Sequence, residues 1–109
     1  MPAATLQRYH IAALDPTEGA EMAKTRPVVI VSLDALNDRL RTVIICPLTS
    51  TLHPGWRTRV PVRIGQRQVE VAVDHIRGIS TARLGRKLGT LSETEAQALR
   101  RRITEMYGE

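Results

Sequence analysis

Two short segments of this sequence combine polar side chains with runs of β-branched residues. In the first, residues 19–32, Arg26 stands at the entrance of the β-branched run. In the second, residues 44–50, Thr49 stands at the exit of the run. A guanidinium and a hydroxyl held at strand ends can bind a phosphate and stabilise the charge that develops on it. The pair therefore predicts an enzyme that acts on a phosphodiester.

Each of these two side chains also has an ordinary structural interpretation. Arg26 can form an ion pair with Glu21 or Asp15, and a threonine in a turn, such as Thr49, usually bonds its own backbone. In favour of a functional role, Pro27 fixes the backbone next to Arg26, so that the guanidinium can be aimed at a substrate. The residue types and their spacing leave both interpretations open.

The sequence carries no recognisable metal-binding motif. Its single cysteine, Cys46, and its three histidines, His10, His53 and His75, are scattered along the chain without metal-ligand spacing. Without a metal, phosphodiester cleavage would use the 2′-OH of RNA as an internal nucleophile, while the protein moves protons and stabilises the pentacoordinate phosphorane. We therefore expect no metal and no cofactor.

The charge of the chain agrees with a polyanionic partner without requiring one. The net charge is +5, and all of the 16 basic residues except Lys24 and Lys87 are arginine. Arginine suits phosphate geometry, and a basic surface concentrates polyanions. A GC-rich genome produces the same composition, so charge alone leaves nucleic-acid binding open. With Tyr9, Trp56 and Tyr107 as its aromatic residues, the chain lacks a stacking platform for several bases.

The length of 109 residues fits one domain, and we expect it to span residues 1–109. One cysteine excludes a disulfide framework. No apolar stretch approaches the ~20 residues of a membrane span, and the N-terminal residues lack the apolar core of a signal peptide. We expect a cytoplasmic protein without a membrane partner.

Hydrophobic patterns predict five or six short strands, a terminal helix and two short helical segments. The expected strands are residues 9–14, 28–31 and 43–46, and the two arms of a hairpin, 60–64 and 69–73, around Gly65 and Gln66. Pro47 lacks an N–H, so strand pairing should weaken or bulge there. One helical turn is expected at residues 32–37, capped by Ser32, and another short helix at residues 80–84.

The C-terminal helix has the clearest signals. Ser92 and Glu95 form a capping box, and Leu91 precedes it as a staple. The apolar residues Ala96, Leu99, Ile103 and Met106 lie on one face, and Gly108 ends the helix. Short strands with a terminal amphipathic helix predict a mainly β fold with helices (α+β), built as a small, strongly bent sheet or barrel.

The two polar segments together resemble the signature of the MazF/PemK/Kid family of toxins from bacterial toxin–antitoxin systems. Residues 21–27 match its Glu-x-x-x-x-Arg-Pro pattern, and residues 46–50 match its Pro-x-Thr-Ser segment. Residues 88–92 are similar to its lead-in to the last helix. The resemblance covers residues 14–108 and implies an SH3-like barrel with a C-terminal amphipathic helix.

The resemblance also implies a function. Family members are metal-independent, sequence-selective endoribonucleases that cleave single-stranded RNA and leave a 2′,3′-cyclic phosphate and a 5′-OH. They are homodimers held in check by a cognate antitoxin. The arginine surplus of this chain would attract an acidic segment of such an antitoxin.

Four site residues follow from this resemblance. The family arginine that matches Arg26 is catalytic, and the threonine that matches Thr49 contacts the scissile phosphate. Ser50 is a neighbouring substrate-binding candidate. Glu21 matches an acidic residue of the family, and it either accepts a proton or orients Arg26.

Asp74 matches a family aspartate and is a further substrate-binding candidate. Here it is followed by His75 in place of the family's glutamine. Histidine titrates near pH 7, although an isolated histidine is more often a surface or hydrogen-bonded residue. The Kid branch has an arginine two residues before this aspartate, where this chain has Ala72, so more proton transfer should fall on Arg26 and Glu21.

The loop at residues 50–58, which is followed by Arg59, corresponds to a variable loop that lies over the RNA in relatives. Trp56 would stack on one base, and Arg57 would join it in binding substrate. The alternative is a tryptophan that packs under its own loop. The family usually opens its first strand with Gly-Asp/Glu-(Ile/Val)-(Trp/Tyr), and residues 7–10 depart from this pattern.

Two other functional classes fit the same fold. A gyrase poison like CcdB uses a C-terminal Trp-Gly-Ile, whereas this chain ends in Tyr107-Gly108-Glu109 and keeps the Arg-Pro and Thr-Ser elements. A non-catalytic SH3-like binding module would leave Arg26 and Thr49 without a shared purpose. The endoribonuclease is the interpretation that uses both.

Overall fold

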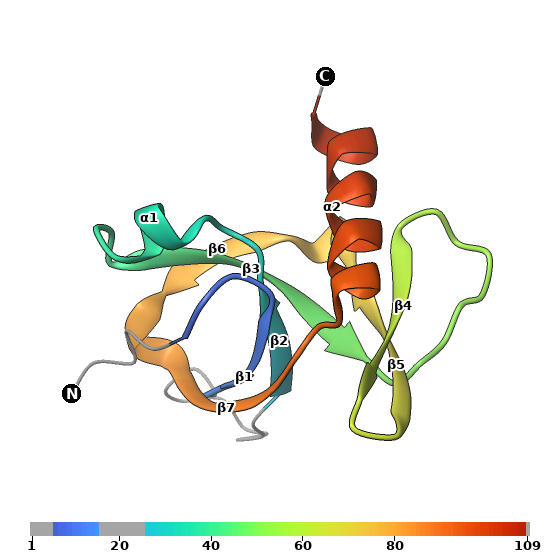
Figure 1. Ribbon diagram of the computed structural model, residues 1–109, viewed down its shortest axis with the longest axis horizontal. Helices are drawn as coiled ribbons and strands as arrows, with labels where there is room; N and C mark the ends of the chain where they lie inside the picture. Colours follow the sequence, from blue (N-terminus) through green and yellow to red (C-terminus); the bar gives the residue numbers. More distant parts are fainter. Residues whose placement is uncertain (1–5, 16–25, 109) are drawn as a thin grey trace.

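The computed structural model describes residues 6–15 and 26–108, which form a curled antiparallel sheet and a C-terminal helix (Figure 1). The strands are β1 (His10–Leu14), β2 (Arg26–Ile30), β3 (Thr42–Thr49), β4 (Arg59–Ile64), β5 (Arg67–Ala72), β6 (Arg77–Ser80) and β7 (Leu84–Thr90). The helices are α1 (Asp34–Asn37), α2 (Glu93–Tyr107) and the 3-10 helices η2 (Val73–His75) and η3 (Thr81–Arg83). The mainly β fold with a C-terminal helix is confirmed.

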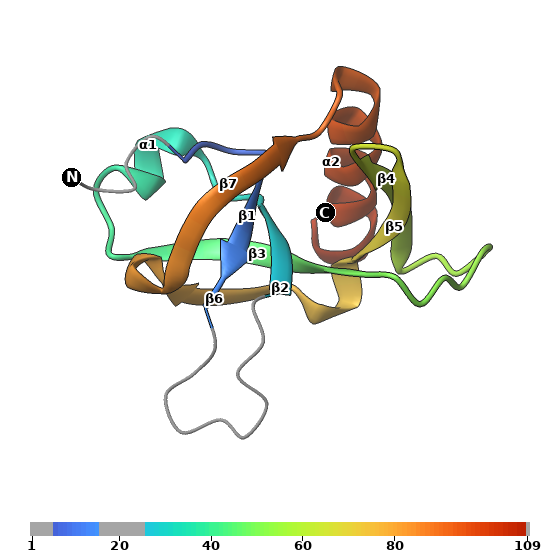
Figure 2. The same ribbon diagram turned by 90° about the horizontal axis from the view of Figure 1, so that it is seen from below.

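The longest strand, β3, joins the two parts of the sheet (Figure 2). Its first half pairs with β6, its middle pairs with β2, and its last two residues pair with β5. The strand order is β4-β5-β3-β2-β1-β7, with β6 also on β3. The strand continues through Pro47, which is level with Val28, and the next residue, Leu48, pairs with Val71 of β5. The expected interruption at Pro47 is therefore a change of partner strand.

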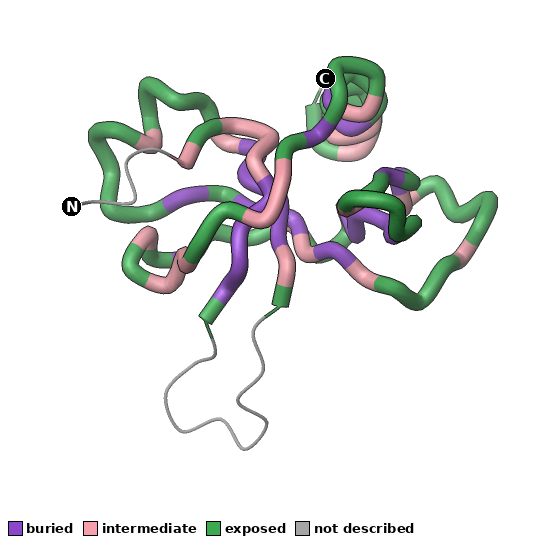
Figure 3. Tube along the Cα trace, turned by 60° about the horizontal axis from the view of Figure 1, so that its bottom comes forward, coloured by how far each residue is buried: buried purple, intermediate pink, exposed green. Residues whose placement is uncertain are grey.

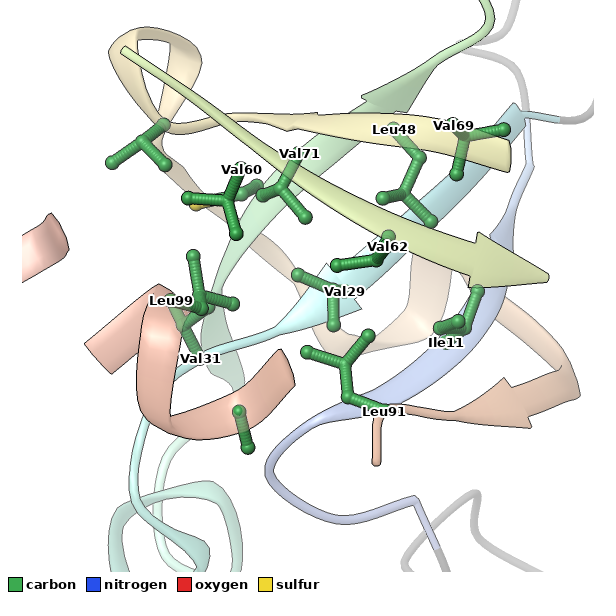
Figure 4. Close-up of a cluster of buried hydrophobic side chains, with 13 residues drawn as sticks. Ile11, Val29, Val31, Leu48, Val60, Val62, Val69, Val71, Leu91 and Leu99 are labelled. Atoms are coloured by element: carbon green, nitrogen blue, oxygen red, sulfur yellow. The ribbon is translucent and has the colours of Figure 1, made fainter. Parts of the chain in front are cut away.

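Strand β2 is buried on both faces, as its continuous β-branched run predicts. Val29 belongs to a large cluster that also contains Ile11, Val62 and Leu99 (Figure 4). Its neighbours Val28 and Ile30 belong to a second cluster. The second cluster is completed by Leu14, Val43, Ile45 and Ile79. Figure 3 shows the buried residues gathered along the central strands, with α1 and the loops exposed.

The hairpin β4–β5 and helix α2 form where the sequence predicts them. Gly65 has φ +63°, a conformation that glycine adopts without strain, and the turn joins strands that pair from Ile64↔Arg67 to Arg59↔Ala72. The capping box is present: the Ser92 hydroxyl accepts the Glu95 N–H at 3.1 Å, and the Glu95 carboxylate accepts the Ser92 N–H at 2.9 Å.

The apolar face of α2 packs on the large cluster, to which β4 also belongs. Ala96 and Leu99 are buried, and Ile103 and Met106 are partly buried against the same cluster. The second oxygen of Glu95 accepts the backbone N–H of Arg63 at 2.9 Å, which ties the start of the helix to β4.

Several element boundaries differ from expectation. Ser32 does not cap α1, since Leu33 takes that position without a side-chain bond. The Ser32 hydroxyl instead accepts the N–H of Ile44 at 3.1 Å and donates to Asn37, which fastens the segment to β3. The second hairpin arm ends at Ala72, and Val73 begins η2.

The first strand begins at His10 because Tyr9 has φ +70°, in the left-handed region. Two backbone bonds hold Tyr9 there: its N–H donates to Ile30 O at 2.6 Å, and its carbonyl accepts from Leu91 N at 3.0 Å. This conformation falls within residues 7–10, where the sequence departs from the family pattern. Strands β6 and β7 were not expected, since most of their residues are partly or fully exposed and no alternation marks them. The short helix expected at residues 80–84 is present as η3.

No helix within the described residues is long and apolar enough to cross a membrane.

Leu99→Ala should lower the free energy of unfolding by about 2–5 kcal/mol, because Leu99 is fully buried where α2 meets the sheet and its removal leaves a cavity. Leu36→Ala, the same change at a half-exposed position of α1, should cost no more than about 0.5 kcal/mol. Urea titration of both variants measures the two values. Equal losses would contradict this account of the core.

Candidate active site

A groove of about 460 Å³ opens where the start of β2 and the end of β3 meet the β4–β5 hairpin. Three arginines line it, and each is the first residue of its strand: Arg26 of β2, Arg59 of β4 and Arg67 of β5. The other lining residues are Pro27, Pro47, Leu48, Thr49, Ser50, Thr51, Ile64, Val69, Ala72 and His75. No carboxylate belongs to this described lining, so the described lining carries a positive charge.

The strand register explains why Arg26 and Thr49 line the same groove. Val28 is level with Pro47 in the antiparallel pair β2–β3. Arg26 at the entrance of β2 and Thr49 at the exit of β3 lie just beyond this pairing, at the same end of the two strands, and both line the groove. The two residues that the sequence singled out, 23 positions apart (49 − 26), are thus brought together by one pair of strands.

The Thr49 hydroxyl has the turn contact that the structural interpretation expected, since it accepts the N–H of Thr51 at 3.0 Å. This bond uses an oxygen lone pair and leaves the hydroxyl hydrogen free to donate. The turn contact and a phosphate contact are therefore compatible. Ser50, which also lines the groove, is exposed.

Asp74 and His75 lie on η2, beside the groove. Asp74 Oδ1 is 3.6 Å from Arg59 Nε, and Asp74 Oδ2 is 3.5 Å from His75 Nε2. His75 lines the groove, whereas Asp74 reaches it through Arg59. The structure thus groups Arg59, Asp74 and His75 as one charged cluster.

Two side chains of helix α2 bind the backbone on which this cluster stands. The Tyr107 hydroxyl donates to the carbonyl of Val73, the first residue of η2, at 2.9 Å. The Arg102 guanidinium donates to the carbonyls of Arg57 and Arg59, the latter at 3.4 Å. One helix therefore anchors both backbone segments that carry the charged cluster.

Trp56 packs within its own loop and remains half exposed. Its ring stacks on His53 at 3.8 Å with an interplanar angle of 10°, and the Arg59 guanidinium lies 5.2 Å from its centroid. Buried Glu70 accepts the backbone N–H of His53 at 2.9 Å and fixes the base of the loop. Neither Trp56 nor Arg57 lines the groove, and Trp56 adjoins it through Arg59.

Sequence reasoning did not select Arg59 and Arg67 as site residues. Counting back from the Gly65-Gln66 turn places Arg59 opposite Ala72, and Ala72 is two residues before Asp74. The sequence could therefore have indicated that Arg59 lies near Asp74. Glu21 lies outside the described residues.

Cys46 is the one thiol of the chain, and it is fully buried in β3. Burial, assisted by the negative charge of Asp74, raises the pKa of Cys46 to about 12. The thiolate form needed for nucleophilic attack is therefore absent at neutral pH, and Cys46 serves as a packing residue.

The comparisons with known proteins agree with this fold. A family model described as PemK-like, MazF-like toxin of type II toxin–antitoxin system matches residues 10–107. Endoribonuclease MazF3 of Mycobacterium tuberculosis is 33% identical over 96 residues, which cover 84% of this chain and 91% of the relative. Endoribonuclease toxin MazF of Escherichia coli K12 is 30% identical over 95 residues, which cover 86% of this chain and 85% of the relative.

Solved structures show the same architecture. MazF in a MazE–MazF crystal from Deinococcus radiodurans superposes with a TM-score of 0.79 at 24% identity, covering 94% of this chain and 95% of the other. The Mycobacterium tuberculosis toxin MazF-mt6 gives a TM-score of 0.72 at 26% identity, covering 89% of this chain and 95% of the other. The chain belongs to the PemK-like, MazF-like toxins of type II toxin–antitoxin systems, which confirms the resemblance seen in its motifs.

Cys46 should not react with a thiol-specific disulfide reagent at pH 8 in the folded protein, since the raised pKa keeps the thiol protonated and the core excludes the reagent. The same reagent should modify one thiol per chain in denaturant. Absorbance of the released chromophore reports both reactions, and rapid modification of the folded chain would contradict the burial of Cys46.

Proposed function

We propose that this protein cleaves single-stranded RNA by promoting attack of a ribose 2′-OH on the adjacent phosphate. Endoribonuclease is the activity named for its curated relatives MazF3 and MazF. The observation that carries the proposal is the groove itself, which presents Arg26 and Thr49 together with two further arginines and no described carboxylate.

The chemistry follows from these groups. A bond forms between the 2′-oxygen and phosphorus while the bond from phosphorus to the 5′-oxygen breaks, and a proton moves from the first oxygen to the second. The Arg26 fork binds the non-bridging oxygens as negative charge grows on them, and the Thr49 hydroxyl donates a further hydrogen bond. Glu21 either accepts the 2′-OH proton or orients Arg26.

We infer that the reaction needs no divalent cation. Mg²⁺ and Ca²⁺ sites in proteins are built from carboxylate and carbonyl oxygens. The described side chains that line this groove are arginines, hydroxyls, a histidine and apolar residues. Such a lining favours a phosphate over a metal ion, and the guanidinium groups supply the positive charge that a metal would otherwise bring.

The remaining site residues are assigned to substrate binding. Ser50 follows Thr49 in the groove, and His75 lines its other side. Asp74 lies within 3.6 Å of both Arg59 and His75, so we assign it the task of holding both side chains at the groove. Trp56 offers its half-exposed ring to one base, and the exposed Arg57 lies next to it in the same loop.

We further infer a cognate antitoxin, since the family is defined by type II toxin–antitoxin systems. The net charge of +5 supports an acidic segment in that partner, and both would act in the cytoplasm. The Deinococcus radiodurans neighbour comes from a MazE–MazF structure. A homodimer remains our prediction for the state of the free toxin.

Cleavage of RNA should persist in excess EDTA and should fall by about 10²-fold in Thr49→Ala, because one hydrogen bond to the developing charge is lost. Arg26→Ala should cost more than Arg26→Lys, since lysine restores the charge but not the two-pronged fork. Gel electrophoresis of a long single-stranded RNA gives the rates.

Arg39→Ala is the matched control for these variants, because Arg39 is exposed and outside the groove. It should cleave at the wild-type rate. Thermal melts should show all variants folded, since none of the three side chains belongs to the core clusters. A folded Arg26→Ala protein with wild-type activity would defeat the assignment.

Trp56→Ala should change which sites in the RNA are cut while leaving measurable activity, because Trp56 adjoins the groove without lining it. Loss of one stacked base costs about 1–3 kcal/mol of binding. Mapping the cleaved sites in a long RNA by primer extension tests this, and an unchanged map would assign Trp56 to packing alone.

A further inference from the structure

Arg59 is a cation with little contact to water and an incomplete set of partners. Its side chain is only 11% exposed. Its Nε is buried and has no hydrogen-bond partner within the described residues. Buried charges are ordinarily paired and hydrogen-bonded, because removing them from water is costly. The charge of Arg59 is therefore incompletely compensated within the described residues, and the groove that this residue lines is where an anion can approach it.

Asp74 does not complete this set. Strong arginine–carboxylate pairs are short, at about 2.7–2.9 Å, and often use two parallel hydrogen bonds. The Asp74 oxygen lies 3.6 Å from Arg59 Nε, and the second oxygen of the same carboxylate faces His75. At this distance Asp74 attracts the Arg59 guanidinium without accepting a hydrogen bond from Nε. The pair therefore contributes little as a structural ion pair, but it can orient the guanidinium.

The guanidinium is nonetheless held in place. The Trp56 ring lies 5.2 Å from it, within the range of a cation–π contact. Across the hairpin its register partner is Ala72, whose small side chain leaves space. Arg102 of α2 donates to the Arg59 carbonyl and fixes its backbone. A side chain that is already ordered loses little entropy when it binds a ligand.

The space available to Arg59 is the groove that it lines with Arg26 and Thr49. We propose that Arg59 is a second substrate-contacting guanidinium, which binds the phosphate backbone of the RNA, and that Asp74 is its positioning residue. This inference rests on the proposed function. A backbone phosphate is the favoured ligand, because three arginines in one groove match the regular charges of a nucleic-acid strand better than the edge of a single base.

A salt titration of binding tests this contact without relying on cleavage. For a single strand, each phosphate neutralised by the protein contributes about −0.7 to the slope of log K against log salt concentration. The probe is a single-stranded DNA oligonucleotide of mixed sequence, which lacks the 2′-OH and cannot be cleaved by the proposed chemistry. Fluorescence anisotropy from low to moderate salt gives the slope for each variant.

Arg59→Gln should reduce the steepness of this slope by about 0.7, because one charged contact is removed. Arg59→Lys should keep the slope, since the charge remains. Arg63→Gln is the matched control: Arg63 is on the same strand and exposed, it does not line the groove, and the loss of its charge should leave the slope unchanged. An Arg59→Gln slope equal to that of wild type would overturn the inference.

Two further results keep the test decisive. If thermal melts show that Arg59→Gln is unfolded, the affinity of Arg59→Lys for the oligonucleotide is the deciding measurement. Binding that is about tenfold weaker would support the inference, because lysine cannot form the two parallel hydrogen bonds of a guanidinium. Wild-type affinity would overturn it. The proposed function is judged separately, by cleavage of RNA by the wild-type protein in EDTA. A wild-type protein that cleaves, with an unchanged slope in Arg59→Gln, would refute only the role of Arg59.

Discussion

The antiparallel pairing of β2 with β3 is the constraint on which the site depends. Pairing in opposite directions places the start of one strand beside the end of the next, and the pairing that ends at Val28↔Pro47 leaves Arg26 and Thr49 at the same end of the two strands, where both line the groove. The β-branched residues of β2 are buried on both faces, so a slip by one residue would exchange the two cores. The relative position of Arg26 and Thr49 is thus fixed by the burial of the apolar residues of β2 rather than by contacts between the two polar side chains.

The hairpin wall of the groove depends on a different kind of contact. Helix α2 packs its apolar face on the sheet, and Arg102 and Tyr107 bind backbone carbonyls beneath Arg59 and η2. A groove with three arginines and no described carboxylate in its lining repels itself electrostatically when empty. The rigid strands and the helix hold these like charges around one groove.

Much of this arrangement could be predicted from local patterns, and the rest depended on long-range pairing. The capping box at Ser92 and the hairpin at Gly65 follow from short-range rules, and the structure confirms both. Motif resemblance selected Arg26 and Thr49, which the groove brings together. Arg59 was not selected because its place in the groove depends on the pairing of β4 with β5, where it is level with Ala72. The Ser32 cap failed because that hydroxyl bonds Ile44 of a neighbouring strand, a contact that no local pattern reveals.

The central claim is that the RNA supplies its own nucleophile and that the groove only stabilises the charge and moves protons. The chemical identity of the new RNA ends tests this claim most directly. Mass spectrometry of a short RNA, cleaved by the protein in EDTA, should find a 2′,3′-cyclic phosphate, or the 3′-phosphate formed by its hydrolysis, on one fragment and a 5′-OH on the other. A 3′-OH paired with a 5′-phosphate would mean that water attacks the phosphorus, and would contradict the account.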